Sequence, residues 1–291
     1  MEQTTNMLEG AITSGINILV VEDEIITARD IEAKLKKLGH GVAGIASSGE
    51  EAMQKAAELT PDMILMDITL DGKMDGIEAS MEIEKHQNVP IIYLTAHTDL
   101  ITLHRAKVTE PHGYIVKPFT QRDLIITISM ALYKHRMEMK LKIMNQMLSL
   151  FLKPITLEKK LHQALEMIVS IPRMFLQTRG SIFLIENDPD TLVLKTALNS
   201  SECPTVAVGQ CLCGLAASSR EVVFSDNIDK RHMLQQDGLP HGHYCVPILA
   251  EGNLLGVLNI FVREGHKYDA AEENILTAYA NVIANALHSS R

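Results

Sequence analysis

The chain of 291 residues exceeds the size that one hydrophobic core usually supports, so we expect two domains joined by a linker. Hydrophobic residues at 46% and charged residues at 22% are typical of folded proteins and argue against wholesale disorder, while the formal net charge of −9 argues against nucleic-acid binding. Residues 1–15, which we expect to be flexible, lack the pattern of a signal peptide, and no apolar run is long enough for membrane insertion; we therefore expect a cytoplasmic protein.

Short apolar runs alternate with segments of helical period between residues 16 and 134. This alternation predicts a doubly wound α/β domain with a five-stranded parallel sheet of the flavodoxin-like kind. Ser48 with Glu51 predicts a capping box before the second helix, and Thr120 with Asp123 predicts one before the fifth. The predicted strands are Ile16–Val21, Val42–Ala46, Met63–Met66, Ile91–Leu94 and Gly113–Val116.

The fifth helix is predicted to continue as a long linker helix over residues 135–153. Mostly apolar side chains repeat along it at alternating spacings of three and four, as in a seam between two helices. Two interpretations stay open: the stripe pairs with the same helix of a second chain and forms a homodimer, or it packs within its own chain. The stripe consists of Met130, Tyr133, Met137, Lys140, Met144, Met147 and Phe151.

From residue 154 to residue 291 the predicted order changes to a helix, several strands and a final helix. That order indicates an α+β domain with an antiparallel sheet. We expect the two helices over Leu157–Ile171 and Asp269–His288. The predicted strands are Ser181–Ile185, Leu192–Ala197, Val222–Ser225, Tyr244–Leu249 and Leu254–Val262.

Reactive side chains follow four of the predicted parallel strands. Because the carboxyl ends of such strands meet at one edge of the sheet, we expect these side chains to converge. Three carboxylates in one place repel one another, and Mg²⁺ with oxygen ligands relieves that repulsion. A cation, an ammonium and a hydroxyl can together stabilise a phosphoryl group in transfer, with Asp67 as the attacking nucleophile. The groups are Glu22, Asp23, Asp67, Thr95 and Lys117.

Four ordered motifs surround these positions. They are Ile18-Leu-Val-Val-Glu22-Asp23-Glu24, Met66-Asp67-Ile68-Thr69, Leu94-Thr95-Ala96 and Tyr114-Ile-Val-Lys117-Pro118-Phe119. In this order they resemble the receiver domain of two-component response regulators, over about residues 16–135.

The resemblance implies a role for each matching residue. Asp67 would accept the phosphoryl group of a phosphohistidine on a histidine kinase or phosphotransfer protein. Glu22, Asp23, Asp67 and the backbone carbonyl of Thr69 would hold Mg²⁺. Thr95 and Lys117 would bind the phosphoryl oxygens, Tyr114 would change rotamer when Thr95 moves, and the peptide bond before Pro118 would be cis.

Two differences limit what the receiver resemblance and the aspartyl-phosphate chemistry imply. The segment Leu70–Gly76 replaces the family's common Met-Pro turn and is one residue longer, which leaves partner choice near this loop open. A phosphatase of the haloacid dehalogenase type also forms an aspartyl phosphate, but it needs a second acid two residues later. Thr69 occupies that position, so this alternative is disfavoured.

The second half of the chain resembles a GAF domain, a module for small-molecule sensing and dimerisation. The matching segments are Val208–Ala217, Tyr244–Ile248 and Gly256–Leu258. The resemblance implies a pocket between the sheet and the loops around residues 226–243.

Cysteines and histidines gather in this second half and suggest either a metal or ligand site or simple packing. Cys211 and Cys213 would share one face if their stretch were extended, and His241, His243 and Cys245 alternate in the same way. The alternative is that small buried cysteines lie beside a histidine-bearing loop. Both interpretations stay open.

The sequence thus predicts a phosphorelay response regulator, not an enzyme, in which a receiver is coupled through a helix to a GAF-like small-molecule or interaction domain. An alternative is the N-terminal sensory portion of a larger histidine kinase or cyclase. A third is a degenerate receiver that only binds partners, which the intact acidic residues disfavour.

Overall fold

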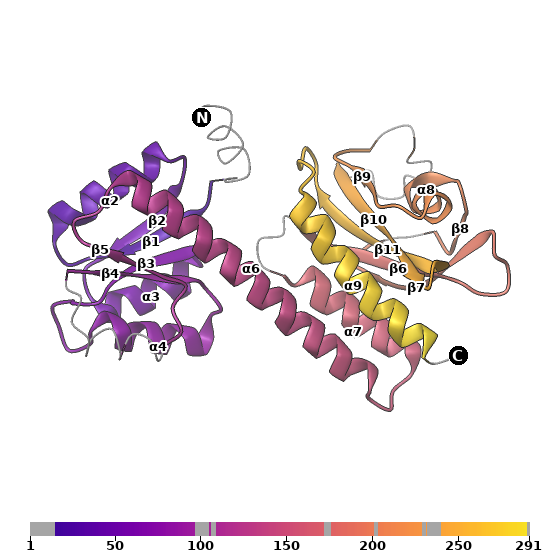
Figure 1. The fold of residues 1–291 in the computed structure, drawn as a ribbon, viewed down its shortest axis with the longest axis horizontal. Helices are drawn as coiled ribbons and strands as arrows, with labels where there is room; N and C mark the ends of the chain where they lie inside the picture. Colours follow the sequence, from indigo (N-terminus) through magenta and orange to yellow (C-terminus); the bar gives the residue numbers. More distant parts are fainter. Residues whose placement is uncertain are drawn as a thin grey trace. The chain divides into compact units, whose positions relative to one another are not determined.

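The computed structural model describes residues 15–96, 105, 109–171, 176–200, 203–228, 231 and 240–289, and the chain divides into two compact units, Met1–Glu138 and Met139–Arg291 (Figure 1). The flexible N-terminus and the fourth receiver helix that the sequence predicts lie outside the described residues. Within the described ranges, no helix is both long enough and apolar enough to cross a bilayer.

The first unit contains a parallel sheet of five strands in the order β2-β1-β3-β4-β5, which confirms the predicted doubly wound fold. β1, β3 and β4 are buried almost throughout, because helices cover both faces of the sheet. Each strand begins and ends within one residue of its predicted bounds. The strands are β1 (Asn17–Val21), β2 (Gly41–Ala46), β3 (Met63–Asp67), β4 (Ile91–Thr95) and β5 (Gly113–Val116).

Two apolar layers attach the helices to this sheet. α2 and the start of α6 cover one face through Ile31 and Leu124, and α3 and α4 cover the other through Ala52 and Ile77. The helices are α2 (Ile25–Lys37), α3 (Gly49–Leu59), α4 (Gly76–His86) and α6 (Gln121–Phe151).

The two predicted capping boxes differ in outcome. At the start of α6 the box is complete, because Thr120 and Asp123 each accept a hydrogen bond from the other's backbone N–H. At the start of α3 only half of it forms. Ser48 accepts from the backbone N–H of Glu51, but the Glu51 carboxylate accepts from the Ser47 backbone instead of reaching back to Ser48.

The predicted seam along α6 is divided between two environments. Met147 is fully buried in the core of the second unit, and Met144 and Phe151 pack against that core. Met130 and Tyr133, in contrast, are 66% and 61% exposed. The later part of the stripe therefore packs within its own chain, and only the earlier part is left to face solvent or a partner.

The second unit contains an antiparallel sheet in the order β8-β7-β6-β11-β10-β9, and this confirms the predicted α+β domain. The sequence interpretation missed β8 and α8. The elements are α7 (Leu157–Val169), β6 (Leu176–Ile185), β7 (Thr191–Leu198), β8 (Thr205–Ala207), α8 (Cys211–Ser219), β9 (Val223–Ser225), β10 (His241–Ala250), β11 (Asn253–Arg263) and α9 (Ala270–His288).

Two cores lie on the two faces of this second sheet. The end of α6, with α7 and α9, packs on one face, and α8 packs on the other (Figure 1). The extended stretch considered for Cys211 and Cys213 is wrong, because both lie in α8. Two residues along a helix correspond to a rotation of about 200° around its axis, so the two side chains lie on nearly opposite faces. Cys213 is therefore buried while Cys211 is partly exposed.

Candidate functional site

An acidic cluster lies at the carboxyl edge of the parallel sheet. Glu22 and Asp23 follow β1, and Asp67 is the last residue of β3. Thr95 is the last residue of β4, and Lys117 follows β5. The doubly wound topology places the ends of these strands side by side, so the sheet brings together the groups that the sequence selected.

Lys117 links the two buried carboxylates of the cluster. Its Nζ atom donates to Oε2 of Glu22 and to Oδ2 of Asp67, each at 2.5 Å. Glu22 is 2% exposed and Asp67 is 6% exposed. The other Asp67 oxygen, Oδ1, accepts from the backbone N–H of Thr69 at 3.0 Å. The peptide bond between Lys117 and Pro118 is cis, as the resemblance implied.

Burial and charge act against each other in this cluster. Burial raises the pKa of Glu22, the hydrogen bond from Lys117 opposes the rise, and repulsion from Asp67 adds to it. For Lys117, burial alone would lower the pKa, but the hydrogen bonds to Asp67 and Glu22 outweigh burial and raise it. The ammonium therefore stays charged, while Glu22 carries a desolvation cost that a second cation would offset.

The acidic cluster fits a hard divalent cation. Oxygen atoms of Glu22, Asp23 and Asp67 lie within 4.8 Å of one another. Three carboxylates against one ammonium leave an excess of negative charge in a largely buried place. Oxygen-only ligands at this spacing suit Mg²⁺ better than a softer metal.

Gly76, which was absent from the sequence-based site, packs directly against the backbone of Asp67. A Cβ atom added at Gly76 would lie 1.8 Å from the Asp67 carbonyl oxygen. The Gly76 N–H donates to the carbonyl of Ile68 at 3.1 Å, and the Asp75 side chain caps the start of α4. The glycine therefore sets how closely α4 approaches the end of β3. In the sequence, the only signal for this role is that Gly76 directly follows an aspartate that can cap a helix.

Tyr114 lies on β5, with its ring centroid 5.9 Å from that of Tyr93. The Tyr93 hydroxyl is 3.0 Å from the hydroxyl of Thr109. The buried hydroxyl of Tyr114 has no hydrogen-bond partner among the residues that the structure describes. Burial also raises its pKa. Moving this hydroxyl would break no hydrogen bond within the described part of the chain, and the switch role of Tyr114 stays a prediction.

The sulfur and imidazole groups of the second unit are only partly brought together. Sγ of Cys213 lies 3.5 Å from Sγ of Cys245, and Nδ1 of His243 lies 2.9 Å from Oδ1 of Asn259. His241 and His243 lie on strand β10, so the histidine-bearing loop is wrong. The pocket expected around residues 226–243 falls largely outside the described residues. Within the described part, no cluster of three potential metal ligands includes these groups, and a metal there stays a prediction.

Comparison with known families divides the chain in the same way. The model of the response regulator receiver domain matches residues 18–129, and the model of the GAF domain matches residues 158–288. These matches agree with the fold of each unit.

Two curated relatives share about a third of their aligned residues with this chain. The transcriptional regulatory protein PdtaR of Mycobacterium tuberculosis is 34% identical over 119 residues, which are 41% of this chain and 58% of that protein. The phyllosphere-induced regulator PhyR of Methylorubrum extorquens is 37% identical over 127 residues, which are 43% and 46% of the two chains. The chain spans about half the length of the curated relatives it matches.

Among solved structures, the receiver domain of a modulated diguanylate cyclase from Desulfovibrio desulfuricans is 38% identical. The match covers 43% of this chain and 99% of that domain, with a TM-score of 0.42.

Proposed function

We propose that this chain, in which a response regulator receiver domain is followed by a GAF domain, accepts a phosphoryl group on Asp67 from a histidine kinase or phosphotransfer protein. The observation that carries the proposal is the arrangement of three carboxylates and one lysine at the carboxyl edge of the parallel sheet. We further propose that the chain transmits a signal and is not itself an enzyme; the two curated relatives are both named as regulators.

The chemistry is an in-line transfer from a phosphorylated imidazole to a carboxylate. A bond forms between a carboxylate oxygen of Asp67 and phosphorus as the donor's phosphorus–nitrogen bond breaks. The electron pair of that bond goes to the imidazole nitrogen, which takes up a proton.

Each neighbouring residue has a separate task in the transfer. Lys117, which already donates to Asp67, would donate to an oxygen of the incoming phosphoryl group. The Thr95 hydroxyl, at the end of the adjoining strand β4, would donate to another phosphoryl oxygen. Mg²⁺, held by Glu22, Asp23, Asp67 and the Thr69 carbonyl, would supply the positive charge that the phosphoryl oxygens need. Tyr114 would respond to Thr95 and carry the change to β5.

The direct test is phosphorylation of the full chain with acetyl phosphate and Mg²⁺, followed by intact mass measurement. We expect wild type to gain one phosphoryl group and Asp67→Asn to gain none. Asp71→Asn is the matched control, because Asp71 is an exposed carboxylate in the loop beside the site. Equal phosphorylation of Asp67→Asn and wild type would refute the assignment.

We also propose that the chain forms a homodimer through the exposed apolar side chains of α6. Ile126 is exposed one turn before Met130 and two turns before Tyr133, so three large apolar groups occupy one face of this helix. We expect sedimentation velocity to show a dimer in wild type and a monomer in Met130→Asp/Tyr133→Asp. Ile26→Asp on α2 is the control, since Ile26 is even more exposed than Met130 and Tyr133 but lies outside α6. A monomeric wild type at micromolar concentration would contradict the dimer.

A further inference from the structure

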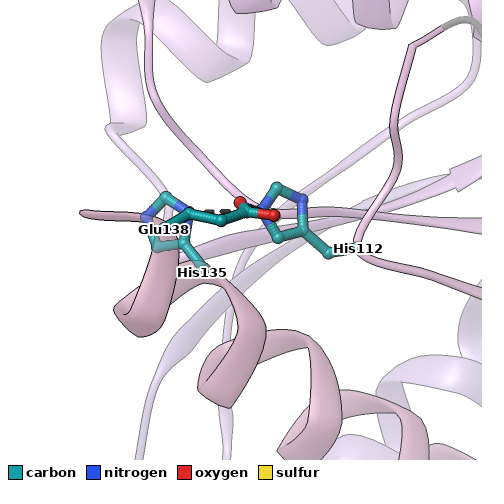
Figure 2. Close-up of side chains that lie close together, drawn as sticks. All are labelled: His112, His135 and Glu138. Carbon is teal, nitrogen blue, oxygen red and sulfur yellow. Dashed lines mark hydrogen bonds and ion pairs between the residues drawn. The ribbon is translucent and has the colours of Figure 1, made fainter. Parts of the chain in front are cut away.

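Two histidines and a glutamate of the first unit lie close together (Figure 2), and they form a group separate from the acidic cluster. His112 directly precedes β5, so it lies at the amino end of a strand, whereas Asp67 lies at the carboxyl end of β3. His135 and Glu138 are three residues apart on α6 and therefore share one face of that helix. The cluster thus connects the entry of β5 to α6.

The spacing of the three side chains suits a tetrahedral metal. Nε2 of His112 lies 3.1 Å from Oε2 of Glu138 and 3.3 Å from Nδ1 of His135, and the three ligand atoms fall within 4.8 Å of one another. Zinc bound at its usual ligand distances holds neighbouring tetrahedral ligands about 3.3 Å apart. Small rotamer adjustments would let one ion contact all three.

We propose that His112, His135 and Glu138 form a binding site for a divalent transition metal, with zinc as the best fit. Two imidazoles and one carboxylate are the ligand types that zinc takes, and three protein ligands leave one position for water. The nitrogen ligands distinguish this site from the all-oxygen acidic cluster, which favours Mg²⁺.

The surroundings favour metal binding over a simple ion pair. The side chain of His112 is 10% exposed and that of Glu138 is 50% exposed, so an ion can enter from the glutamate side. Burial lowers the pKa of His112, which keeps its ring neutral and able to act as a ligand. The ammonium of Lys134 repels a bound cation, but it lies 3.7 Å from the other glutamate oxygen, Oε1, and donates to the carbonyl of Pro111, so Oε2 stays available to the metal.

One contact must be given up when the metal binds. The backbone N–H of Ile91 donates to Nδ1 of His112 at 3.4 Å, which places the ring proton on Nε2. Binding through Nε2 displaces that proton, and the ring is then protonated at Nδ1. With its proton on Nδ1 the ring would face the Ile91 N–H donor to donor, so the ring has to turn away from Ile91 when the metal binds; the contact given up is long for a hydrogen bond, at 3.4 Å.

The test is a zinc titration of the full chain by calorimetry, with excess Mg²⁺ to fill the acidic cluster. We expect wild type to bind one zinc at this site and expect His112→Gln and His135→Gln each to weaken that binding at least about tenfold. His86→Gln is the matched control, since His86 is exposed at the end of α4 and belongs to no such cluster among the described residues. It should bind zinc as wild type does.

Two further variants separate this site from other zinc ligands in the chain. Asp67→Asn and Cys213→Ser should both bind zinc with the affinity of wild type, whereas His135→Gln should bind it more weakly. Urea unfolding without metal verifies that each variant is folded, and a given zinc concentration should raise the stability of wild type more than that of His135→Gln. Absence of zinc binding by wild type, or wild-type binding by both histidine variants, would overturn the proposal.

Discussion

Substitution of Gly76 by alanine tests the packing that positions the acidic cluster. The added Cβ would lie 1.8 Å from the carbonyl oxygen of Asp67 and 2.9 Å from its carbonyl carbon. Both obstacles are backbone atoms, so no side-chain rotation relieves the clash. To reach even a tight contact of 3.0 Å, α4 or the end of β3 has to move by about 1.2 Å.

This displacement has two expected consequences. Overpacking in a well-packed region lowers the free energy of unfolding by about 1–3 kcal/mol. If the end of β3 moves, the Asp67 carboxylate shifts relative to Lys117, and an error of about 1 Å in a reacting group costs on the order of a hundredfold in rate. We therefore expect Gly76→Ala to be less stable and to accept phosphoryl groups much more slowly.

Urea unfolding and the rate of phosphorylation by acetyl phosphate measure these two effects. Gly44→Ala is the control, because its added Cβ would meet the end of the flexible Leu59 side chain at 2.9 Å rather than a backbone atom. It should lose little stability and no phosphorylation rate. A Gly76→Ala protein with wild-type stability and wild-type rate would refute the packing argument.

Three further substitutions test the site and its frame. Because burial raises the pKa of Glu22, the stability linked to this group is fully present below the ordinary carboxyl value of 4.5 and is lost as pH rises through the raised value. In Glu22→Gln the free energy of unfolding, measured with urea across pH, should fall less as pH rises, and Mg²⁺ should stabilise the protein less. An unchanged pH profile of this free energy would contradict the role given to Glu22. Asp75→Ala removes the capping box of α4 and should lower the unfolding free energy by about 1 kcal/mol, whereas Asp71→Ala should not; equal stabilities would argue against the cap. Tyr114→Phe should change stability by less than about 0.5 kcal/mol in thermal or urea unfolding, and a loss above about 1 kcal/mol would mean that the hydroxyl has a partner.

The parallel sheet and its site were predictable because their signals are local. A strand buried on both faces needs a continuous apolar run, and β1 and β3 have one. Reactive residues at the carboxyl ends of such strands converge in any doubly wound sheet, so the proximity of Asp67 and Lys117 could be predicted from the sequence alone.

The remaining features depend on packing that no local pattern records. α8 has Leu and Ala beside small residues, and this mixture left the stretch around Cys213 open to an extended assignment. The role of Gly76 depends on the path of α4 past Asp67. His112 and His135 are 23 residues apart and meet only because β5 and α6 bring them together.

The seam on α6 shows the same limit. Its period indicated an apolar face, but not which part of that face is buried or by what. Met147 packs in the core of its own unit, while Met130 stays exposed. The same periodic stripe therefore lies partly in a core of its own chain and partly on an exposed face.

Mapping the phosphorylated residue tests the central claim most directly. The full chain would be phosphorylated in the presence of Mg²⁺, reduced with borohydride to convert an aspartyl phosphate into homoserine, and digested for peptide mass spectrometry. We expect homoserine at position 67 alone, and none when Mg²⁺ is replaced by a chelator. Conversion at another aspartate, with position 67 unchanged, would contradict the proposed site.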